Sequence, residues 1–411
     1  MPMRSRLPGL ADAAIAVAMA GVLYYLALRV RLWEDFYVES APAVRALIAG
    51  RLHSFLTLAP VYGGSLLLQA PASLLGGAIA GLDGAYRFGS LFCIGALCAL
   101  ALWLARLQRA DGRRLPARLL AIAVVVANPA ASWAVKEGHP EEILAAVMCV
   151  GGMLLLLRGR VSAAAILLGL AVATKQWALL ALPLAFVAAA GERLRFSILA
   201  GASAALLAAP MALANAGRVI ATNRGLSASP DIFHPQQIWW ALHLYYMRPL
   251  GGPTSTIFGP SPVAFVASYS HPLIVVCAVL LALAYWSRRR RVEPSDALLM
   301  LALVLLVRCM LDPWNVIYYQ FPFLLCLAAW EIATRRRAPL LALLASGLVW
   351  LSFRPVNLGS SGDATDLFYL TWALPAALLM LWRSLRLPRP RPLDAIRRLP
   401  RDRGAAALAR R

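Results

Sequence analysis

Two adjacent carboxylates, Glu34 and Asp35, stand in the stretch RLWEDFYVES, directly after an apolar segment long enough to cross a membrane. Trp33 and Phe36 flank the pair. A carboxylate between aromatic side chains in a partly dry cavity would have a shifted pKa and could accept a proton from a sugar hydroxyl. It could also bind a metal ion. The pair is therefore a candidate general base or metal ligand at a membrane surface.

A structural explanation of the same pair remains open. An acid at the end of a membrane-spanning helix can simply be solvated. It can also form an ion pair with Arg29 or Arg31, which precede it in the chain. The pair alone does not decide between these explanations and a chemical role.

A second polar group lies in the stretch ASWAVKEGHPEEIL. Pro140 suits the first position of a helix, and Glu141 and Glu142 suit its first turn, where the helix dipole favours negative charge. This explanation does not cover Lys136 and His139, because cations are disfavoured at the outer end of a span. His139 is therefore a second candidate for a functional role.

Two further cations could bind a phosphate. Lys175, in the stretch ATKQW, has no obvious partner for an ion pair nearby in the sequence, so it could either snorkel to the surface or bind a phosphate. Arg308 and Asp312 are four residues apart and share a helix face, so they could pair structurally. Alternatively, Arg308 contacts an anionic headgroup while Asn315 and Gln320 contact a sugar.

Residues 215–270 form a long connection rich in aromatic, amide and histidine side chains. Aromatic faces stack on the C–H surfaces of sugars and amides bind hydroxyl groups, so this composition is compatible with carbohydrate binding. A later pair, Arg354 and Asn357, is of the same kind. The polar set in the long connection is His234, Gln236, Gln237, His243, Tyr245 and Arg248.

The elements that must position these residues are membrane-spanning helices. The 411-residue chain is 61% hydrophobic with a mean hydropathy of +0.69, and apolar runs recur along it. We expect an all-α polytopic membrane domain over residues 1–385 and a basic tail over 386–411. Twelve spans are expected, at about 10–30, 86–106, 117–135, 141–157, 161–174, 176–190, 196–214, 271–287, 296–313, 317–333, 339–353 and 366–383.

The net charge of +21 follows the positive-inside rule, so it requires no nucleic-acid partner. With both termini in the cytoplasm, the predicted inner segments hold 28 of the 40 Lys and Arg residues. The tail is predicted to lie against anionic lipid headgroups. We expect the protein to lie in a bacterial-type plasma membrane as a multi-pass protein. The inner basic segments are Arg4–Arg6, Arg106–Arg118, Arg158–Arg160, Arg193–Arg195, Arg288–Arg291, Arg335–Arg337 and Arg383–Arg411.

Two long outer loops, residues 31–85 and 215–270, hold most of the polar candidates. The first contains a partly amphipathic segment and an apolar segment broken by Gly and Pro, which predict helices on the membrane surface. No Walker loop, GxSxG or HExxH motif is present. No inner loop is large enough to bind a nucleotide sugar. A sugar donor would therefore be lipid-linked and approached from the outer side.

These features together resemble the GT-C fold glycosyltransferases, in particular the family 87 type that uses polyprenyl-phosphate mannose. The resemblance rests on the acidic pair and the following FYVESAPAVRALIAG, on the long first outer loop, on TKQWALLALPL and on LDPWNVIYYQFPFLLCLAAWE. It implies a GT-C-like bundle of about 12 transmembrane helices. It also implies a polyprenyl-phosphate sugar donor, a glycolipid, polysaccharide or protein acceptor, and surrounding membrane lipids as partners.

The resemblance further implies an inverting transfer with assigned residue roles. Asp35, with Glu34 as second choice, would deprotonate the acceptor hydroxyl, whose oxygen attacks the anomeric carbon. Lys175, Arg308, His139 and Arg354 would bind the donor phosphate. Some GT-C enzymes use a divalent cation such as Mg or Mn and others do not, so the metal is undetermined. The candidate sugar and acceptor ligands are Glu142, Gln176, His234, Gln237, His243, Tyr245, Asn315 and Tyr319.

Two other functions compete with this one. A transporter or flippase of lipid-linked sugars would also need a polytopic membrane domain. Against it, the chain has no internal repeat of broken helices and no series of ionisable residues in mid-span. The second competing function is that of an inactive scaffold or polymerase-associated protein.

Overall fold

The computed structural model describes residues 7–29, 33–60, 62–217, 220, 234–242, 262–288, 294–353 and 362–386. All regular secondary structure in these ranges is helical. The α-helices are α1 (Leu7–Arg29), α2 (Ala41–Ile48), α3 (Leu52–Leu58), α4 (Gly64–Ala110), α5 (Leu115–Val126), α6 (Pro129–Glu137), α7 (Pro140–Leu157), α8 (Val161–Thr174), α9 (Leu182–Ala188), α10 (Arg193–Ala214), α13 (Pro262–Arg288), α14 (Pro294–Leu311), α15 (Phe321–Ala333), α16 (Leu340–Phe353) and α17 (Gly362–Arg386). Short π- and 3₁₀-helical turns are η2 (Phe36–Ser40), η3 (Gln176–Ala181), η4 (Trp240–Leu242) and η5 (Ile317–Gln320).

Within the described ranges, seven helices are long and apolar enough to cross a membrane. Each of the twelve expected segments falls on helical structure, but several of the helices are shorter than a span requires. The all-helical fold is thus confirmed, and the count of about twelve spans stays a prediction. The seven long apolar segments are Gly9–Arg29, Gly64–Ala110, Leu115–Glu137, Pro140–Leu157, Arg193–Ala214, Ser268–Ser287 and Asp363–Leu385.

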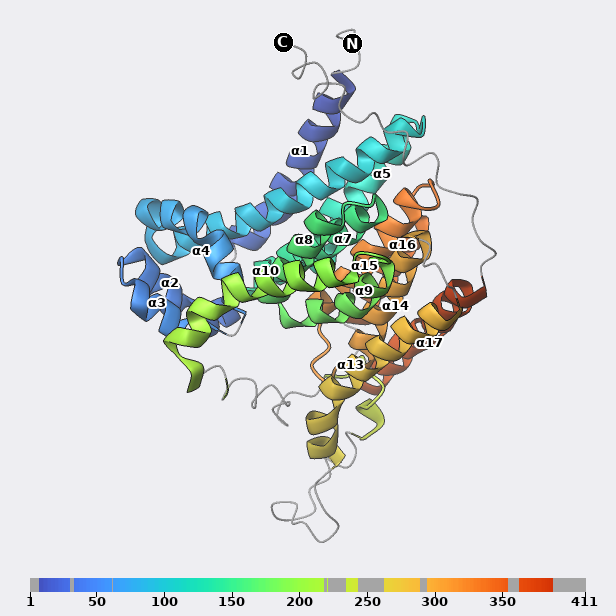
Figure 1. Cartoon of the computed structure of the whole chain (residues 1–411). Helices are drawn as coiled ribbons and strands as arrows, with labels where there is room; N and C mark the ends of the chain where they lie inside the picture. Colours follow the sequence, from blue (N-terminus) through green and yellow to red (C-terminus); the bar gives the residue numbers. More distant parts are fainter. Residues whose placement is uncertain are drawn as a thin grey trace.

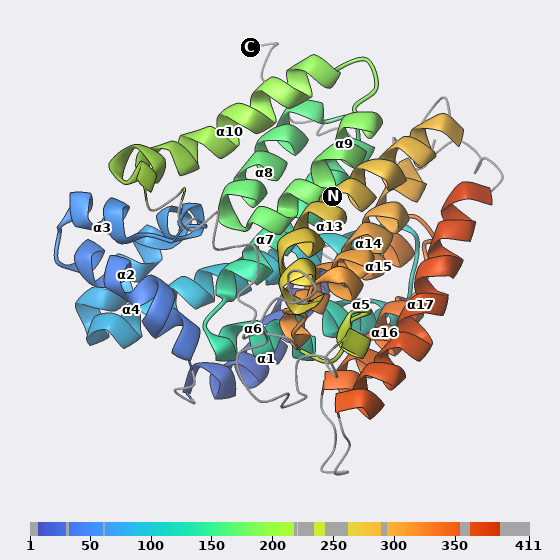
Figure 2. The ribbon, with the colours of Figure 1, turned by 90° about the horizontal axis from the view of Figure 1, so that it is seen from below.

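The centre of the bundle is formed by α7, α14 and α15 (Figure 1). Helices α7 and α15 are apolar nearly all round and almost every residue in them is buried, as expected for helices inside a bundle. Helix α8 packs between α7 and α10 (Figure 2). In contrast, α10, α13 and α17 expose many large apolar side chains, which suits helices that face lipid.

The first predicted outer loop forms a separate helical layer at one side of the bundle. Helix α2 packs with α3 and α4, α3 also contacts α10, and α16 and α17 lie on the other side of the bundle (Figure 1). Helix α4 is sharply kinked at Ala80 and Gly81, where Gly81 has a φ of 61°. A Cβ on Gly76 would lie 2.1 Å from the carbonyl oxygen of Gly84, so the kink depends on glycine at this close approach. Helices α2 and α3 and the start of α4 lie within residues 31–85, and the assignment of these segments as membrane-surface helices stays a prediction.

Candidate active site

The stretch WEDF is anchored by its two aromatic residues. Trp33 and Phe36 are three residues apart and both are buried, with ring centroids 4.4 and 4.6 Å from that of Tyr86 in α4. The Tyr86 hydroxyl in turn donates a hydrogen bond to the Val135 carbonyl in α6. This packing fixes the backbone around Asp35, whose side chain remains 46% exposed.

Asp35 accepts a hydrogen bond from a buried histidine. The Nε2 of His139 lies 2.9 Å from Asp35 Oδ2. Gly138 makes this approach feasible, because its φ of 108° is left-handed and a Cβ there would lie 2.5 Å from the backbone nitrogen of Phe36. The Gly-His-Pro sequence between α6 and α7 therefore positions the imidazole directly behind the Asp35 carboxylate.

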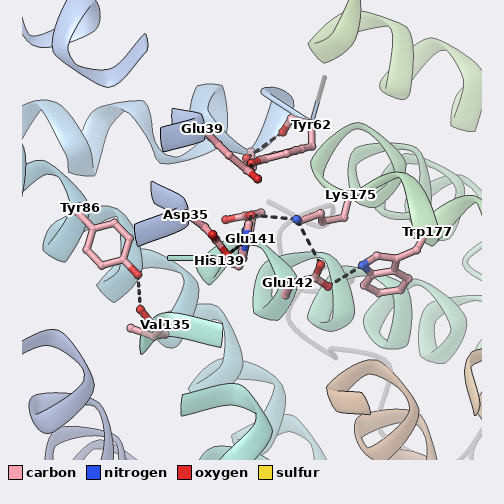
Figure 3. A network of polar contacts seen from close by, with 11 residues as sticks. Asp35, Glu39, Tyr62, Tyr86, Val135, His139, Glu141, Glu142, Lys175 and Trp177 are labelled. Carbon is pink, nitrogen blue, oxygen red and sulfur yellow. Dashed lines mark hydrogen bonds and ion pairs between the residues drawn. The ribbon is translucent and has the colours of Figure 1, made fainter. Parts of the chain in front are cut away.

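A chain of alternating charges continues from His139 into the protein (Figure 3). His139 Nδ1 lies 2.8 Å from Glu141 Oε1, and the same oxygen lies 3.1 Å from Lys175 Nζ. Lys175 Nζ lies 3.3 Å from Glu142 Oε1, and the Trp177 indole donates to Glu142 Oε2 at 2.6 Å. Both glutamates are in the first turn of α7, where the helix dipole stabilises them. Lys175 and Trp177 come from the junction between α8 and η3.

The electrostatics favour a positively charged His139. Burial and the Lys175 ammonium lower the pKa of His139, but the charge of Glu141 and the hydrogen bonds to Asp35 and Glu141 outweigh them and raise it to about 9. Burial also lowers the pKa of Lys175, and Glu141 and Glu142 raise it above its ordinary value. At neutral pH the imidazolium therefore donates from both ring nitrogens and joins two carboxylates.

Glu39 and Tyr62 cover the charge chain from the first loop (Figure 3). The Tyr62 hydroxyl donates to the Glu39 carboxylate. Lys175 Nζ lies 4.2 Å from the centroid of the Tyr62 ring, a cation–π contact. Burial raises the pKa of Glu39, although His139 and Lys175 act in the opposite direction. The loop helices thus contribute directly to the environment of His139 and Lys175.

A cavity of about 440 Å³ opens beside Asp35. Its volume is within the range of small-ligand sites. The wall combines two carboxylates with aromatic, amide and imidazole groups from both ends of the sequence. The lining residues are Asp35, Trp133, Glu137, His234, Gln236, Asn315, Val316, Ile317, Tyr318 and Phe353.

A second charged cluster surrounds Arg308 at the end of α14. Arg308 Nε lies 4.0 Å from Asp312 Oδ2, and the guanidinium lies over Tyr319 at 4.3 Å and Trp177 at 5.4 Å from the ring centroids. The other carboxylate oxygen of Asp312 is 3.6 Å from His271 Nε2. Trp177 connects this cluster to the Glu142 carboxylate.

The model of glycosyltransferase family 87 matches residues 64–313, more than half of the chain. The chain belongs to glycosyltransferase family 87. Searches among curated proteins and among solved structures gave no match to this chain. The resemblance inferred from the sequence is thereby confirmed, and the chain is a multi-pass membrane glycosyltransferase.

The matched region covers most of the candidate site but not all of it. His139, Glu142, Lys175 and Arg308 lie inside residues 64–313. Asp35 precedes the matched region, so its assignment rests on the geometry of this chain. The structure brings Asp35, His139, Glu142 and Lys175 of this glycosyltransferase into one connected network, although they are far apart in sequence.

Lys175 has ion-pair partners that its surroundings in the sequence do not show. Its ammonium contacts Glu141 and Glu142, which are too distant in sequence to be recognised as partners. The predicted pair of Arg308 and Asp312 is confirmed. Asp35 pairs with His139, while the Arg29 guanidinium contacts the Tyr25 ring and hydroxyl.

The other predicted site residues divide into four groups. His234 and Asn315 line the cavity, and burial lowers the pKa of His234 so that its imidazole is neutral near pH 7. Gln237 is buried and bonds to the backbone of its own turn, and Tyr319 packs under Arg308. Glu34 and Gln176 are exposed. His243, Tyr245 and Arg354 lie outside the described residues, as do Arg248 and Asn357.

Two cavity residues of this family 87 enzyme were missed by the sequence analysis. Trp133 and Glu137 line the cavity. Both belong to the stretch ASWAVKEGHPEEIL but are part of no recognised motif. They are four residues apart and share one face of α6. That spacing, together with a neighbouring His139, is the signal that could have identified them.

The described residues do not form an obvious metal site. Among them, no group of three His, Cys, Asp or Glu side chains is arranged to hold a metal ion. Both ring nitrogens of His139 are already bonded to carboxylates.

Proposed function

We propose that this glycosyltransferase transfers a sugar from a polyprenyl-phosphate donor to an acceptor hydroxyl, with inversion at the anomeric carbon. The observation that supports the proposal is the hydrogen bonding and exposure of the Asp35 carboxylate. One oxygen is held by His139 at 2.9 Å, and the side chain is 46% exposed at a cavity of about 440 Å³. A carboxylate that is fixed in direction and open to a ligand suits a general base.

The proposed reaction proceeds in one displacement. Asp35 takes the proton of the acceptor hydroxyl through the oxygen that His139 does not hold. The acceptor oxygen attacks the anomeric carbon while the bond from that carbon to the phosphate oxygen breaks. The polyprenyl phosphate leaves with the bonding electrons, and a single displacement inverts the configuration.

Within this proposal His139 is a positioning residue. The imidazole is fixed by the hydrogen bond that its Nδ1 donates to Glu141, and Lys175 in turn fixes Glu141. This assignment differs from the expected role of His139 in phosphate binding. Both ring nitrogens of His139 are engaged with carboxylates, so neither is available to a phosphate oxygen.

Arg308 is the best-supported cation for the leaving phosphate. Its side chain is buried, and its Nη1 has no hydrogen-bond partner in the structure. Its ion-pair partner Asp312 is 4.0 Å away and is shared with His271, and the charge of Glu142 acts on it without an ion pair as close as those of Lys175. Lys175, in contrast, is neutralised by two carboxylates at 3.1 and 3.3 Å. A charge that lacks a close partner is the one that an incoming phosphate would stabilise most.

The sugar and the face of the membrane on which the active site lies are also part of the proposal. Mannose or a related sugar fits a cavity wall that combines amides with the Trp133 and Phe353 rings. The distribution of Arg residues supports an active site on the outer face and cytoplasmic termini. The acceptor would then be a glycolipid, a polysaccharide or a protein on the outer face.

A donor-competition experiment tests this proposal. The full chain, reconstituted in liposomes with an acceptor-containing membrane extract, is offered radiolabelled polyprenyl-phosphate mannose or GDP-mannose. We expect label to enter the acceptor fraction from the lipid-linked donor alone. Transfer from GDP-mannose in the absence of polyprenyl phosphate would contradict the donor assignment. Movement of the lipid-linked sugar across the bilayer without any transfer would favour a flippase instead.

A further inference from the structure

A cluster of arginines surrounds one buried indole near the end of α15. Trp330 is 1% exposed. The guanidinium carbons of Arg335 and Arg383 lie 5.2 and 5.1 Å from its ring centroid, and that of Arg337 lies 5.9 Å away. Arg383 belongs to the last turns of α17, whereas the other two follow α15 directly. Two distant segments thus converge on the same ring.

The backbone at this point is shaped to gather the side chains. Arg336 has a φ of 51°, the only positive φ among the described non-glycine residues. The turn closes with hydrogen bonds from Arg335 N to the Trp330 carbonyl and from Arg337 N to the Glu331 carbonyl. The Arg336 side chain pairs with Asp111 at 3.5 Å, whereas Arg335 and Arg337 on either side of it lie beside the indole. A left-handed conformation at a non-glycine residue is disfavoured and needs support from its surroundings.

Several donors in this cluster have no acceptor. The Nε and Nη2 of Arg335, the Nε of Arg337 and the Nε of Arg383 are buried without a hydrogen-bond partner, as is the indole nitrogen of Trp330. Buried donors are normally satisfied, so such a concentration points to a missing ligand. Burial, then the charges of Arg383 and Arg337, lower the pKa of Arg335.

The nearby acids do not neutralise the cluster. Glu331 Oε1 lies 3.0 Å from Arg337 Nη2, and its other oxygen accepts from the Ala342 backbone. Asp296 exerts an attraction on Arg335 but contributes less than the two arginines that repel it. Three guanidinium groups therefore face two carboxylates, one of which is committed to Arg337.

A simpler explanation accounts for only part of this arrangement. Arginines are favoured in the last turn of a helix because they complement its dipole, and both α15 and α17 end here. The dipole does not explain why side chains from two helices meet on one ring. Nor does it explain four guanidinium nitrogens without acceptors.

We propose that Arg335, Arg337 and Arg383 form a binding site for a phosphate group, remote from the cavity beside Asp35. Trp330 is twelve positions after Tyr318 of the cavity wall along η5 and α15, which corresponds to roughly 18 Å along a helix. Arginine forks match phosphate oxygens in bidentate geometry. The phosphate can belong to an anionic phospholipid headgroup or to free inorganic phosphate. Both segments are predicted from the sequence to face the cytoplasm.

The experiment measures thermal stability of the purified full chain in neutral detergent with phosphatidylcholine. Phosphatidylglycerol or sodium phosphate is added at constant ionic strength. The test variant is Arg335→Gln/Arg383→Gln, which spares the pair of Arg337 with Glu331. The control is Arg193→Gln/Arg195→Gln, which removes two charges from another predicted inner segment, where Arg195 pairs with exposed Glu192.

The proposal predicts that phosphatidylglycerol raises the midpoint temperature of unfolding of the wild type and of the control variant. The test variant should bind this lipid roughly tenfold or more weakly than the wild type does. A midpoint shift with sodium phosphate as well would identify a general phosphate site, and a shift with the lipid alone would identify a headgroup site. Equal responses of all three proteins, or no response of wild type to either additive, would overturn the proposal. If the double variant does not fold, Arg383→Gln alone must show weakened binding, and unchanged binding would overturn it.

Discussion

Gly138 should be essential to the position of Asp35. Replacing it with alanine places a Cβ 2.5 Å from the Phe36 nitrogen, 3.1 Å from its Cβ and 3.3 Å from its Cα. These atoms are backbone or next to it, and Phe36 is buried against Tyr86, so they cannot move freely. The φ of 108° at residue 138 adds strain for any residue with a Cβ.

The size of the effect follows from the required displacement. Ordinary contact begins at 3.4 Å, so the Phe36 nitrogen must retreat by 0.9 Å from 2.5 Å. Asp35 is the next residue, and its 2.9 Å hydrogen bond to His139 would be lost or distorted. A misplacement of about 1 Å in a catalytic group can cost on the order of 10²-fold in rate. Strain and overpacking should also cost about 2–4 kcal/mol of stability.

Gly159→Ala is the matched control. Gly159 has a similar positive φ of 71°, but a Cβ there meets nothing within 4 Å. Both variants would be compared for midpoint temperature and for sugar transfer from a polyprenyl-phosphate donor, at a temperature where each is folded. We expect Gly159→Ala to lose some stability and keep its rate, and Gly138→Ala to lose both. If Gly138→Ala transfers sugar as fast as Gly159→Ala, the positioning of Asp35 by this turn is refuted.

Three further perturbations test other parts of the site. Lys175→Met should destabilise the protein by about 3–5 kcal/mol, because it leaves buried Glu142 without its ion-pair partner and Glu141 with His139 alone, whereas Arg195→Met should have little effect on the midpoint temperature. His139 should stabilise the fold in its charged form, because its pKa of about 9 in the folded protein exceeds the ordinary value of 6.5. Its contribution to the free energy of unfolding, roughly 3 kcal/mol, is complete below pH 6.5 and is lost as the pH rises through 9. Midpoint temperatures between pH 6 and pH 10 should fall more for wild type than for His139→Gln, and parallel curves would contradict this. Arg308→Gln should raise the KM for the lipid-linked donor and lower kcat, and an unchanged donor dependence would remove Arg308 from the phosphate site.

Much of the fold was predictable because its elements depend on local composition. The apolar run after His139 is bounded by Pro140 and Leu157 in the structure, close to the predicted 141–157. The Pro-Glu-Glu start of that helix was also predicted, since dipole and proline preferences act within one turn. The junction at Lys175 likewise lies where α8 ends.

The network itself could not be predicted, because its contacts are tertiary. Asp35 and His139 are 104 residues apart, and they meet only because Trp33 and Phe36 bury against Tyr86 while Gly138 allows a close approach. Lys175 looked unpaired for the same reason, as its partners belong to another helix. A lysine or arginine that has no acidic partner nearby in the sequence can therefore still be paired in the folded protein.

The preference for Asp35 over Glu34 now has a physical basis in this chain. Adjacent residues on a helical turn point in different directions. Trp33 and Phe36 fix the turn so that Asp35 faces His139 and the cavity, while Glu34 is exposed. The two acids, equivalent in sequence, differ in burial, partners and access to the cavity.

The most direct test of the account is a comparison of Asp35→Asn with Glu34→Gln. Sugar transfer from a polyprenyl-phosphate donor is measured for both purified variants, with midpoint temperature as the check on folding. Asparagine keeps the shape of Asp35 but cannot take a proton at neutral pH, so transfer should fall by roughly 10²–10⁴-fold. Glu34→Gln should transfer at close to the wild-type rate. Full activity in a folded Asp35→Asn variant, or loss of activity confined to Glu34→Gln, would contradict the assignment of Asp35 as the base.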